Sequence, residues 1–371
     1  MNVILTTYQG AILGPIARVL GYILQALYAL LANFGIENTG ICMILFTFLV
    51  NGLMMPMQIK QQKFSKMSMI MNPEIQAIQK KYKNKKDQAS QQKMSLETQA
   101  VYQKYGVSPA SGCLPMLITF PILFALYRVI YNIPAYVPQV YAIYDNLAKV
   151  LQDAGVTVSQ LADKSYISNP TYVVTQAVKA AKSDAGNINY YIDVLSQFNS
   201  AGWDVLIKNH PDLTSVITKT AEQARKINYF LGMNIADTPK IKSLSVIIPV
   251  LSIITQYIST KLSMAGTQQQ TVNSDNPMGQ SMQTMNTIMP FMTGFMCLMF
   301  PIGVGIYWIA GNVFRIFQQL CINLYFTKIN MDDMIKENVE KAKKKYEKMG
   351  MDPSVLEKAA KTRTSNINTA A

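Results

Sequence analysis

Residues 40–60, GICMILFTFLVNGLMMPMQIK, constrain the fold of this chain more than any other stretch. A helix that spans a bilayer needs roughly 20 mostly apolar residues, and this run is close to that length. Asn51 lies inside the run, and Pro56 and a long basic segment follow it. A polar side chain in such a helix costs free energy unless it faces protein or water. The surroundings of Asn51 are therefore the first thing that a structure must explain.

The composition indicates a membrane protein. Half of the 371 residues are apolar and 15% are charged, whereas a soluble domain carries about 25% charged residues. The four cysteines lie in or beside apolar runs without a CxxC pair, and His210 is the only histidine. The sequence therefore gives little support for a zinc site, a disulfide framework or a Ser-His-Asp triad. We expect no metal, no cofactor and no enzymatic activity, and the start of the chain does not read as a cleaved signal peptide.

The apolar runs predict an all-α, polytopic membrane bundle of five transmembrane helices. These helices cover residues 37–57, 111–136, 242–262, 286–301 and 304–325. Pro301 and Gly303 predict a tight turn between the last two.

The first 36 residues contain a further apolar stretch that begins near Pro15. Arg18 and the short link to the next span favour an interfacial helix within residues 1–36. If this stretch instead spanned the bilayer, the orientation of everything after it would be inverted. The sequence leaves both interpretations open.

The polar segments predict two helical additions to the bundle. Residues 58–110 are strongly basic and form a helical hairpin, in which Pro73 opens a first helix that ends near Tyr82. A second hairpin helix runs from about Gln88 to Tyr105. Residues 137–241 form a helical insert, with helices expected near residues 139–153, 170–183, 187–198 and 212–231. Residues 263–285 form a loop and residues 326–371 a charged tail.

The distribution of charge predicts the orientation. The hairpin is basic, whereas residues 137–240 carry nine basic and nine acidic residues. Basic loops near spans lie on the cytoplasmic side, so the hairpin, the 263–285 loop and the basic tail are cytoplasmic and the insert is extracytoplasmic. The net charge of +13 then mainly reflects topology. Phosphate contacts to ribosomal RNA remain a secondary use of this charge, and no DNA partner is expected.

Five sequence motifs carry a resemblance to a known family. They are VNGLMMPM at 50–57, NPEIQAIQKKY at 72–82, SGCLPMLITFPILFALYRVI at 111–130, IIPVLSIITQYISTKLS at 247–263 and FPIGVGIYWIAGNVFRIFQQL at 300–320. In order and spacing the chain resembles the YidC/Oxa/Alb family of membrane protein insertases. The resemblance covers about residues 40–130 and 243–325 and leaves out the insert.

This resemblance implies a hydrophilic groove that opens to the cytoplasm and to lipid and is closed on the outer side. The groove accepts a polar segment of a client while the apolar helix of the client enters the bilayer. Nascent membrane proteins and lipid are then the partners, with the ribosome, a targeting receptor and the general secretory channel as further ones. The protein is expected in the bacterial plasma membrane as a multi-pass protein.

The resemblance also implies site residues. The groove residues would be Asn51, Gln256, Trp308, Thr119 and Thr47. Family members usually have an arginine where Asn51 stands, so we expect hydration rather than charge pairing at this position. The basic positions expected to contact client or ribosome are Lys80, Lys81, Lys83, Lys85, Lys86, Lys343, Lys344 and Lys345.

Other interpretations remain open at this point. Asn51 could serve only as an interhelical hydrogen bond, which contributes about 0.6 kcal/mol in membrane proteins. A small-solute transporter or channel is the first alternative function, although we see no paired half-helices or inverted repeats. A membrane-anchored assembly scaffold, whose insert binds a partner, is the second.

Overall fold

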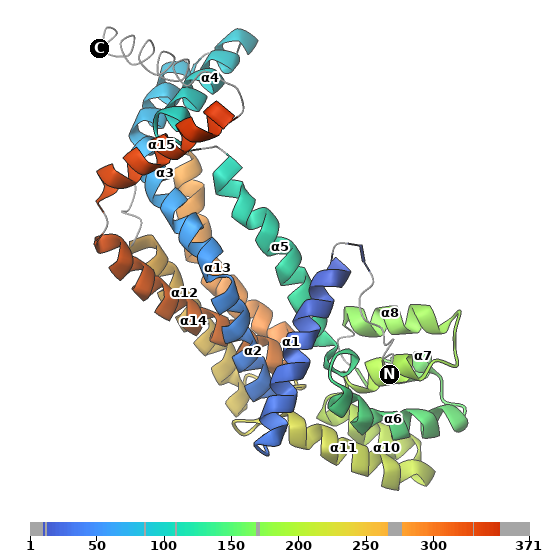
Figure 1. Ribbon diagram of the computed structural model, residues 1–371. Helices are drawn as coiled ribbons and strands as arrows, with labels where there is room; N and C mark the ends of the chain where they lie inside the picture. Colours follow the sequence, from blue (N-terminus) through green and yellow to red (C-terminus); the bar gives the residue numbers. More distant parts are fainter. Residues whose placement is uncertain are drawn as a thin grey trace. The chain divides into compact units, whose positions relative to one another are not determined.

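The computed structural model describes residues 10–11, 13–84, 87–107, 110–167, 171–265, 277–328 and 330–348 (Figure 1). These residues are almost entirely helical, and the only sheet among them is one two-stranded hairpin. The all-α class is therefore confirmed for this part of the chain. The chain divides into two compact units: Met1–Gly52, Thr119–Ser259 and Gln283–Arg315 form unit 1, and Leu53–Ile118, Thr260–Met282 and Ile316–Ala371 form unit 2.

Six helices are rich in apolar residues. They are α1 (Leu13–Asn33), α2 (Thr39–Leu53), α5 (Ala110–Tyr131), α12 (Ile247–Ala265), α13 (Pro277–Met299) and α14 (Ile302–Thr327). Two helical stretches in the described residues, Leu13–Asn33 and Leu244–Met264, are long and apolar enough to cross a membrane, and a third is counted if α2 and α3 (Met55–Tyr82) form one broken span. The count of five transmembrane helices stays a prediction.

The expected break between the last two apolar helices is present. Helix α13 ends at Met299 and α14 begins at Ile302, with Pro301 between them. The loop expected at 263–285 is wrong at both ends, because α12 continues to Ala265 and α13 already begins at Pro277. Proline suits a first helical turn, and the Met and Gln residues that follow have high helix propensity although they are polar or weakly apolar.

The described residues from 133 to 246, which contain the insert, form short helices and the β-hairpin. In order these are η1 (Ile133–Ala135), α6 (Pro138–Asp153), α7 (Val158–Leu161), α8 (Tyr172–Ala181), α9 (Ile188–Leu195), α10 (Ser200–Asn209), η2 (Pro211–Leu213), α11 (Thr214–Asn228), β1 (Tyr229–Phe230), β2 (Met233–Asn234) and η3 (Leu244–Val246). The four predicted helices correspond to α6, α8, α9 and α11. Helices α7 and α10 were not predicted. Fully buried leucine and isoleucine side chains, including Leu147, Leu161, Ile192 and Leu206, form a core.

The end of the insert is anchored to the first residues of α14 and α2. The backbone N–H groups of Ile302 and Gly303 donate to the carbonyls of Asp237 (2.8 Å) and Ile235 (2.9 Å). The Oγ1 of Thr39 donates toward the carbonyl of Ile227 at 2.7 Å and lies 2.6 Å from Oδ1 of Asn228. The first N–H groups of a helix have no partner within it, so the chain after α11 supplies acceptors that α14 needs.

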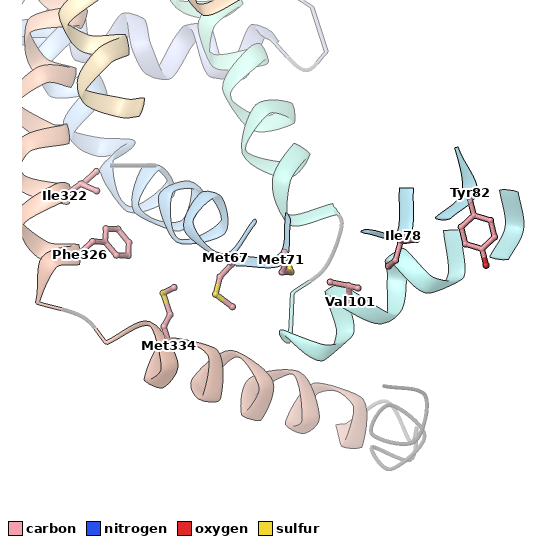
Figure 2. Packing of buried hydrophobic residues seen from close by; sticks show 8 residues of the cluster. All are labelled: Met67, Met71, Ile78, Tyr82, Val101, Ile322, Phe326 and Met334. Carbon is pink, nitrogen blue, oxygen red and sulfur yellow. The ribbon is translucent and has the colours of Figure 1, made fainter. Parts of the chain in front are cut away.

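Unit 2 contains α3, α4 (Gln88–Lys104) and α15 (Met331–Lys348). Its apolar core joins these helices to the last turns of α14, as Figure 2 shows for Met67, Met71, Ile78, Tyr82, Val101, Ile322, Phe326 and Met334. The Nζ atom of Lys66 lies 5.0 Å from the ring centre of Phe326. The second hairpin helix is confirmed by α4.

The prediction that Pro73 opens the first hairpin helix is wrong. Helix α3 begins at Met55 with Pro56 in its first turn, and Pro73 lies inside it. An interior proline costs about 3 kcal/mol through a lost hydrogen bond and a steric clash. Met71 and Ile78, on either side of Pro73, are buried in the core of unit 2, and this packing offsets the cost.

Candidate functional site

Asn51 and Thr47 lie one turn apart on α2, in unit 1. The Nδ2 of Asn51 donates to the carbonyl oxygen of Thr47 at 2.7 Å. The hydroxyl of Thr47 donates to the carbonyl of Met43 at 2.6 Å, and its side chain is fully buried. Asn51 itself is half-buried. Both of these bonds stay within α2, and in the described part of the chain no hydrogen bond joins Asn51 to another helix.

A polar set on α12 and α14 belongs to the same unit. Nδ2 of Asn312 donates to Oγ1 of Thr255 at 3.3 Å, and Nη2 of Arg315 donates to Oδ1 of Asn312. Asn312 is fully buried, whereas Arg315 is exposed on the surface of the protein. Both amide atoms of Asn312 are thus satisfied, one by each neighbour. This arrangement fixes the guanidinium of Arg315 relative to α12.

Close packing brings the α2 and α14 polar residues together. A Cβ atom at Gly311 would lie 3.7 Å from Cγ2 of Thr47 and 3.8 Å from Nη2 of Arg315. The rings of Phe48 and Phe314 have centres 5.5 Å apart. These are ordinary van der Waals distances, so Thr47 of α2 and the guanidinium of Arg315 lie beside the same point of α14. We call Thr47, Asn51, Thr255, Asn312 and Arg315 the polar cluster.

The structure brings together some of the predicted groove residues and separates another. Gln256 follows Thr255 on α12 and is half-buried. Trp308 is half-buried and meets Phe300 edge to face, with ring centres 6.1 Å apart. It packs against an apolar group that contains Tyr131, Val173 and Val304. No described contact links Trp308 to the polar cluster. Thr119 lies in α5, but its side chain is outside the described residues.

The sequence reasoning missed Arg315, Asn312 and Thr255. A signal for Arg315 was available, because it is the only charged residue in the whole of α14. Asn312 precedes it by three positions, which places both side chains on one face of a helix. Thr255 carried no signal, since a threonine in an apolar helix most often bonds to its own backbone. Thr255 also does this, toward the carbonyl of Leu251 at 2.7 Å.

A second row of amides lies in unit 2. Nε2 of Gln62 donates to Oε1 of Gln319 at 3.0 Å, and Nε2 of Gln319 donates to Oδ1 of Asn323 at 2.8 Å. Nδ2 of Asn323 reaches the carbonyl of Leu262 at 3.4 Å. Gln318, by contrast, is buried with neither amide atom hydrogen-bonded in the described residues. These contacts join α3, α12 and α14 through side-chain amides.

The predicted basic positions are distributed over unit 2. Lys80, Lys81 and Lys83 are exposed. Lys344 pairs with Glu340 at 2.7 Å, and Lys343 is half-buried. Lys85 and Lys86 lie outside the described residues, as does the side chain of Lys345. The contact of these residues with client or ribosome stays a prediction.

Two matching contacts hold the hairpin together. Glu97 accepts from Nζ of Lys81 and from the hydroxyl of Tyr82, both at 2.9 Å. Glu74 accepts from Nζ of Lys104 at 2.7 Å and from the hydroxyl of Tyr105 at 2.6 Å. Burial, and then the bond to Glu74, raise the pKa of Tyr105 to about 12. Each Lys-Tyr pair of one helix thus meets a glutamate of the other.

A cavity in unit 1 lies away from the polar cluster. It measures about 640 Å³ including solvent-open space, and Thr39, Tyr131, Gln197 and Gly303 are among its lining residues. None of the predicted groove residues lines it. Within the described part of the chain, no three His, Cys, Asp or Glu side chains are grouped as a metal site would need.

Most of the chain matches known proteins. Residues 30–329 match the family described as "60Kd inner membrane protein". The membrane protein insertase YidC of Oceanobacillus iheyensis is 27% identical over 287 residues, which cover 77% of this chain and 75% of that protein. YidC of Clostridium perfringens is 28% identical over 312 residues, which cover 83% and 90%. Over a shorter stretch of 109 residues, which cover 29% and 41%, the membrane protein insertase MisCA of Bacillus subtilis is 42% identical.

These matches confirm the resemblance to YidC-type proteins that the five motifs carry. They extend it across the insert, which lies within the matched residues. The chain belongs to the 60Kd inner membrane protein family.

Proposed function

We propose that this chain is a membrane protein insertase of the bacterial plasma membrane. The relatives bear the name membrane protein insertase, and the family is described as an inner membrane protein. The observation that carries the proposal is the polar cluster, which places a charged and several polar side chains among the apolar helices α2, α12 and α14. Nascent membrane proteins are the clients and the bilayer is their destination.

The physical task explains the use of such a cluster. Carrying a polar segment across about 30 Å of hydrocarbon without partners is prohibitive. A groove that water enters from the cytoplasm shortens the dry part of the path. The polar cluster lines this groove in our proposal, and Asn51 offers amide hydrogen bonds to water and client. The partitioning of the client's apolar helix into lipid supplies the driving force, so no covalent chemistry is required.

The topology completes the proposal. Five helices span the bilayer, α1 lies in the interface, the hairpin and tail are cytoplasmic and the insert is extracytoplasmic. The basic exposed side chains Lys80 and Lys83 then face the compartment of the ribosome, the targeting receptor and the secretory channel. The basic excess of residues 58–110 supports this orientation through the positive-inside rule. A cysteine accessibility map, with insert positions labelled from outside, tests it.

The experiment that tests the function uses the purified full chain in liposomes. A client synthesised in vitro should become protease-protected only when the protein is present. Asn51→Ala should reduce the insertion of clients with polar translocated tails more than the insertion of clients without them. An equal effect on both kinds of client would mean that Asn51 has only a structural role. Solute flux through liposomes that insert no client would instead favour a transporter. Binding of a partner protein to residues 137–241, without any client entering the liposome membrane, would favour a scaffold.

A further inference from the structure

Near its end the insert forms a β-hairpin whose tip exposes a leucine. Strands β1 and β2 pair antiparallel, with Phe230 opposite Met233 before the turn. The two turn residues, Leu231 and Gly232, both have positive φ, at +49° and +80°. A two-residue turn of this kind favours Asn or Asp before the glycine, because other side chains are strained there. Leu231 is nevertheless 72% exposed, so the turn does not require it and water disfavours it.

A second turn, closed by Lys240 and Ser245, lies beside the hairpin tip. The backbone N–H of Lys240 donates to Oγ of Ser245 at 2.9 Å. This turn exposes two apolar side chains, Ile241 by 74% and Leu244 by 62%. A Cβ atom at Gly232 would lie 3.5 Å from Cδ2 of Leu244, so the hairpin tip and the turn adjoin. The exposed apolar residues of the two turns and of β1 form a surface that we call the apolar rim: Tyr229, Leu231, Ile241 and Leu244.

The apolar rim continues the exposed stripe of a candidate membrane span. Leu244 is the first residue of the stretch Leu244–Met264, which is long and apolar enough to cross a membrane. Exposed apolar side chains recur along this stretch at helical spacing, at Ile247, Val250, Leu251, Ile254, Tyr257 and Ile258. An exposed apolar surface of this extent marks a membrane or protein contact. Because the chain is a plasma membrane protein, lipid covers such a stripe, and the rim lies where the stripe ends.

The charge around the apolar rim favours lipid as its occupant. Residues 223–245 contain four basic residues and one acidic residue, Asp237. The carboxylate of Asp237 accepts from the backbone N–H and the hydroxyl of Ser200, at 2.9 and 3.0 Å. The four basic side chains are exposed: Arg225, Lys226, Lys240 and Lys242. Basic side chains beside an apolar surface suit anionic lipid headgroups. A twofold dimer through the rim would instead bring these like charges together.

The hairpin also contacts the start of α2. A Cβ atom at Gly40 would lie 2.9 Å from Cγ of Phe230, and Nδ2 of Asn38 donates to the carbonyl of Tyr229 at 2.8 Å. The residues that follow the hairpin supply acceptors to the first N–H groups of α14 and then lead into α12. A hairpin that is held at the membrane surface therefore sets the depth at which these three helices begin.

We infer that the apolar rim inserts into the lipid leaflet on the insert's side and anchors the insert to the bilayer. The flanking basic side chains bind anionic headgroups, and Tyr229 lies at the headgroup level, where tyrosine is enriched. Burial of Leu231 in lipid offsets the strained backbone of the turn. This goes beyond the proposed function, because it concerns how the insert is held and not how a client crosses the membrane.

The test uses the purified full chain in liposomes, with a photo-reactive side chain at Leu231. The same probe at Ala185, which is exposed between α8 and α9 of the insert, is the control. Lipid adducts at position 231 should exceed those at position 185 about tenfold, as the transfer of a leucine-sized side chain from water implies. Addition of anionic lipid to neutral vesicles should raise the adducts at position 231 about threefold. Lys240→Gln combined with Lys242→Gln should abolish this rise.

Leu231→Asn separates anchoring from folding. Asparagine tolerates positive φ better than leucine does, so thermal unfolding in detergent should occur at the same or a higher temperature. Lipid adducts from a probe at Ile241 should nevertheless fall at least about threefold, because the apolar tip is lost. Ala185→Asn is the matched control and should leave the adducts at Ile241 unchanged.

Three results would overturn the inference. The first is an equal yield of lipid adducts at positions 231 and 185, which would place the rim in water. The second is crosslinks from position 231 mainly to a second copy of the chain. The third is an unchanged adduct yield at Ile241 in the Leu231→Asn variant. Lipid adducts as expected, in vesicles that insert no client, would support the anchor and count against the proposed function alone.

Discussion

Gly305 of α14 lies directly against Ile248 of α12. A Cβ atom at Gly305 would be 2.3 Å from Cγ2 of Ile248, far closer than two carbon atoms can approach. A few residues further along α14, the same atom at Gly311 would make ordinary contacts at 3.7 and 3.8 Å. The two glycines therefore have different roles, although the sequence presents them alike.

Gly305→Ala should destabilise the protein by about 1–3 kcal/mol, the usual cost of overpacking a well-filled interface. Gly311→Ala should change stability by less than about 0.5 kcal/mol, because its new methyl group fits. Thermal unfolding of both variants in the same detergent measures the difference. Equal stability of the two would show that α12 and α14 do not pack as described.

Gln318 and Gln319 form a second matched pair. Gln318→Met should raise stability by about 1–2 kcal/mol, because it removes a buried amide with no hydrogen-bond partner in the described residues. Gln319→Met should lower stability by a similar amount, since Gln62 and Asn323 each lose a bond. Denaturant or thermal unfolding of unit 2 tests both. A destabilised Gln318→Met variant would mean that a ligand or water satisfies Gln318.

The hairpin should loosen at alkaline pH. The folded hairpin holds the proton of Tyr105 more tightly than the unfolded chain does, because burial and the bond to Glu74 raise the pKa of Tyr105 from 10.0 to about 12. This contribution to stability is fully present below pH 10 and is lost as the pH rises through about 12. Hydrogen exchange of α3 and α4 measured across this range should show the loss.

Tyr105→Phe is the control for the pH effect. It removes the titrating group, so the part of the alkaline loss due to Tyr105 should disappear, while stability near neutral pH falls by about 0.5–1.5 kcal/mol. An unchanged alkaline profile in this variant would assign the effect to other groups, such as Tyr82, whose pKa burial and Glu97 also raise.

Much of the fold could be predicted because apolar runs and proline positions act locally. The break at Pro301 and the second hairpin helix followed from these signals. The prediction at Pro73 was wrong because the packing of α3 against residues distant in sequence outweighs the free-energy cost of a proline inside a helix. Helix α10 was missed since Gly202 normally weakens a helix. Here Gly202 allows a close approach, as a Cβ would lie 2.3 Å from the carbonyl oxygen of Tyr166.

The site could be predicted only in part. The motif around Asn51 and Thr47 led to a stretch of α2 where Thr47 lies beside Gly311 and near the guanidinium of Arg315. The role of these two residues in a groove stays a prediction. The bond between Asn312 and Thr255 depends on how α14 meets α12, which no local pattern encodes. Trp308 carried a motif match, yet its contacts are with Phe300 and the apolar residues near Tyr131.

The central claim is that the polar cluster faces the client. A photo-crosslinking side chain placed at Asn51, with a ribosome-bound nascent membrane protein stalled during insertion, tests it most directly. The same probe at Tyr22, which is 69% exposed on α1, serves as the comparison. We predict strong crosslinks from position 51 to the client and mainly lipid adducts from position 22. Lipid adducts alone at position 51 would contradict the account.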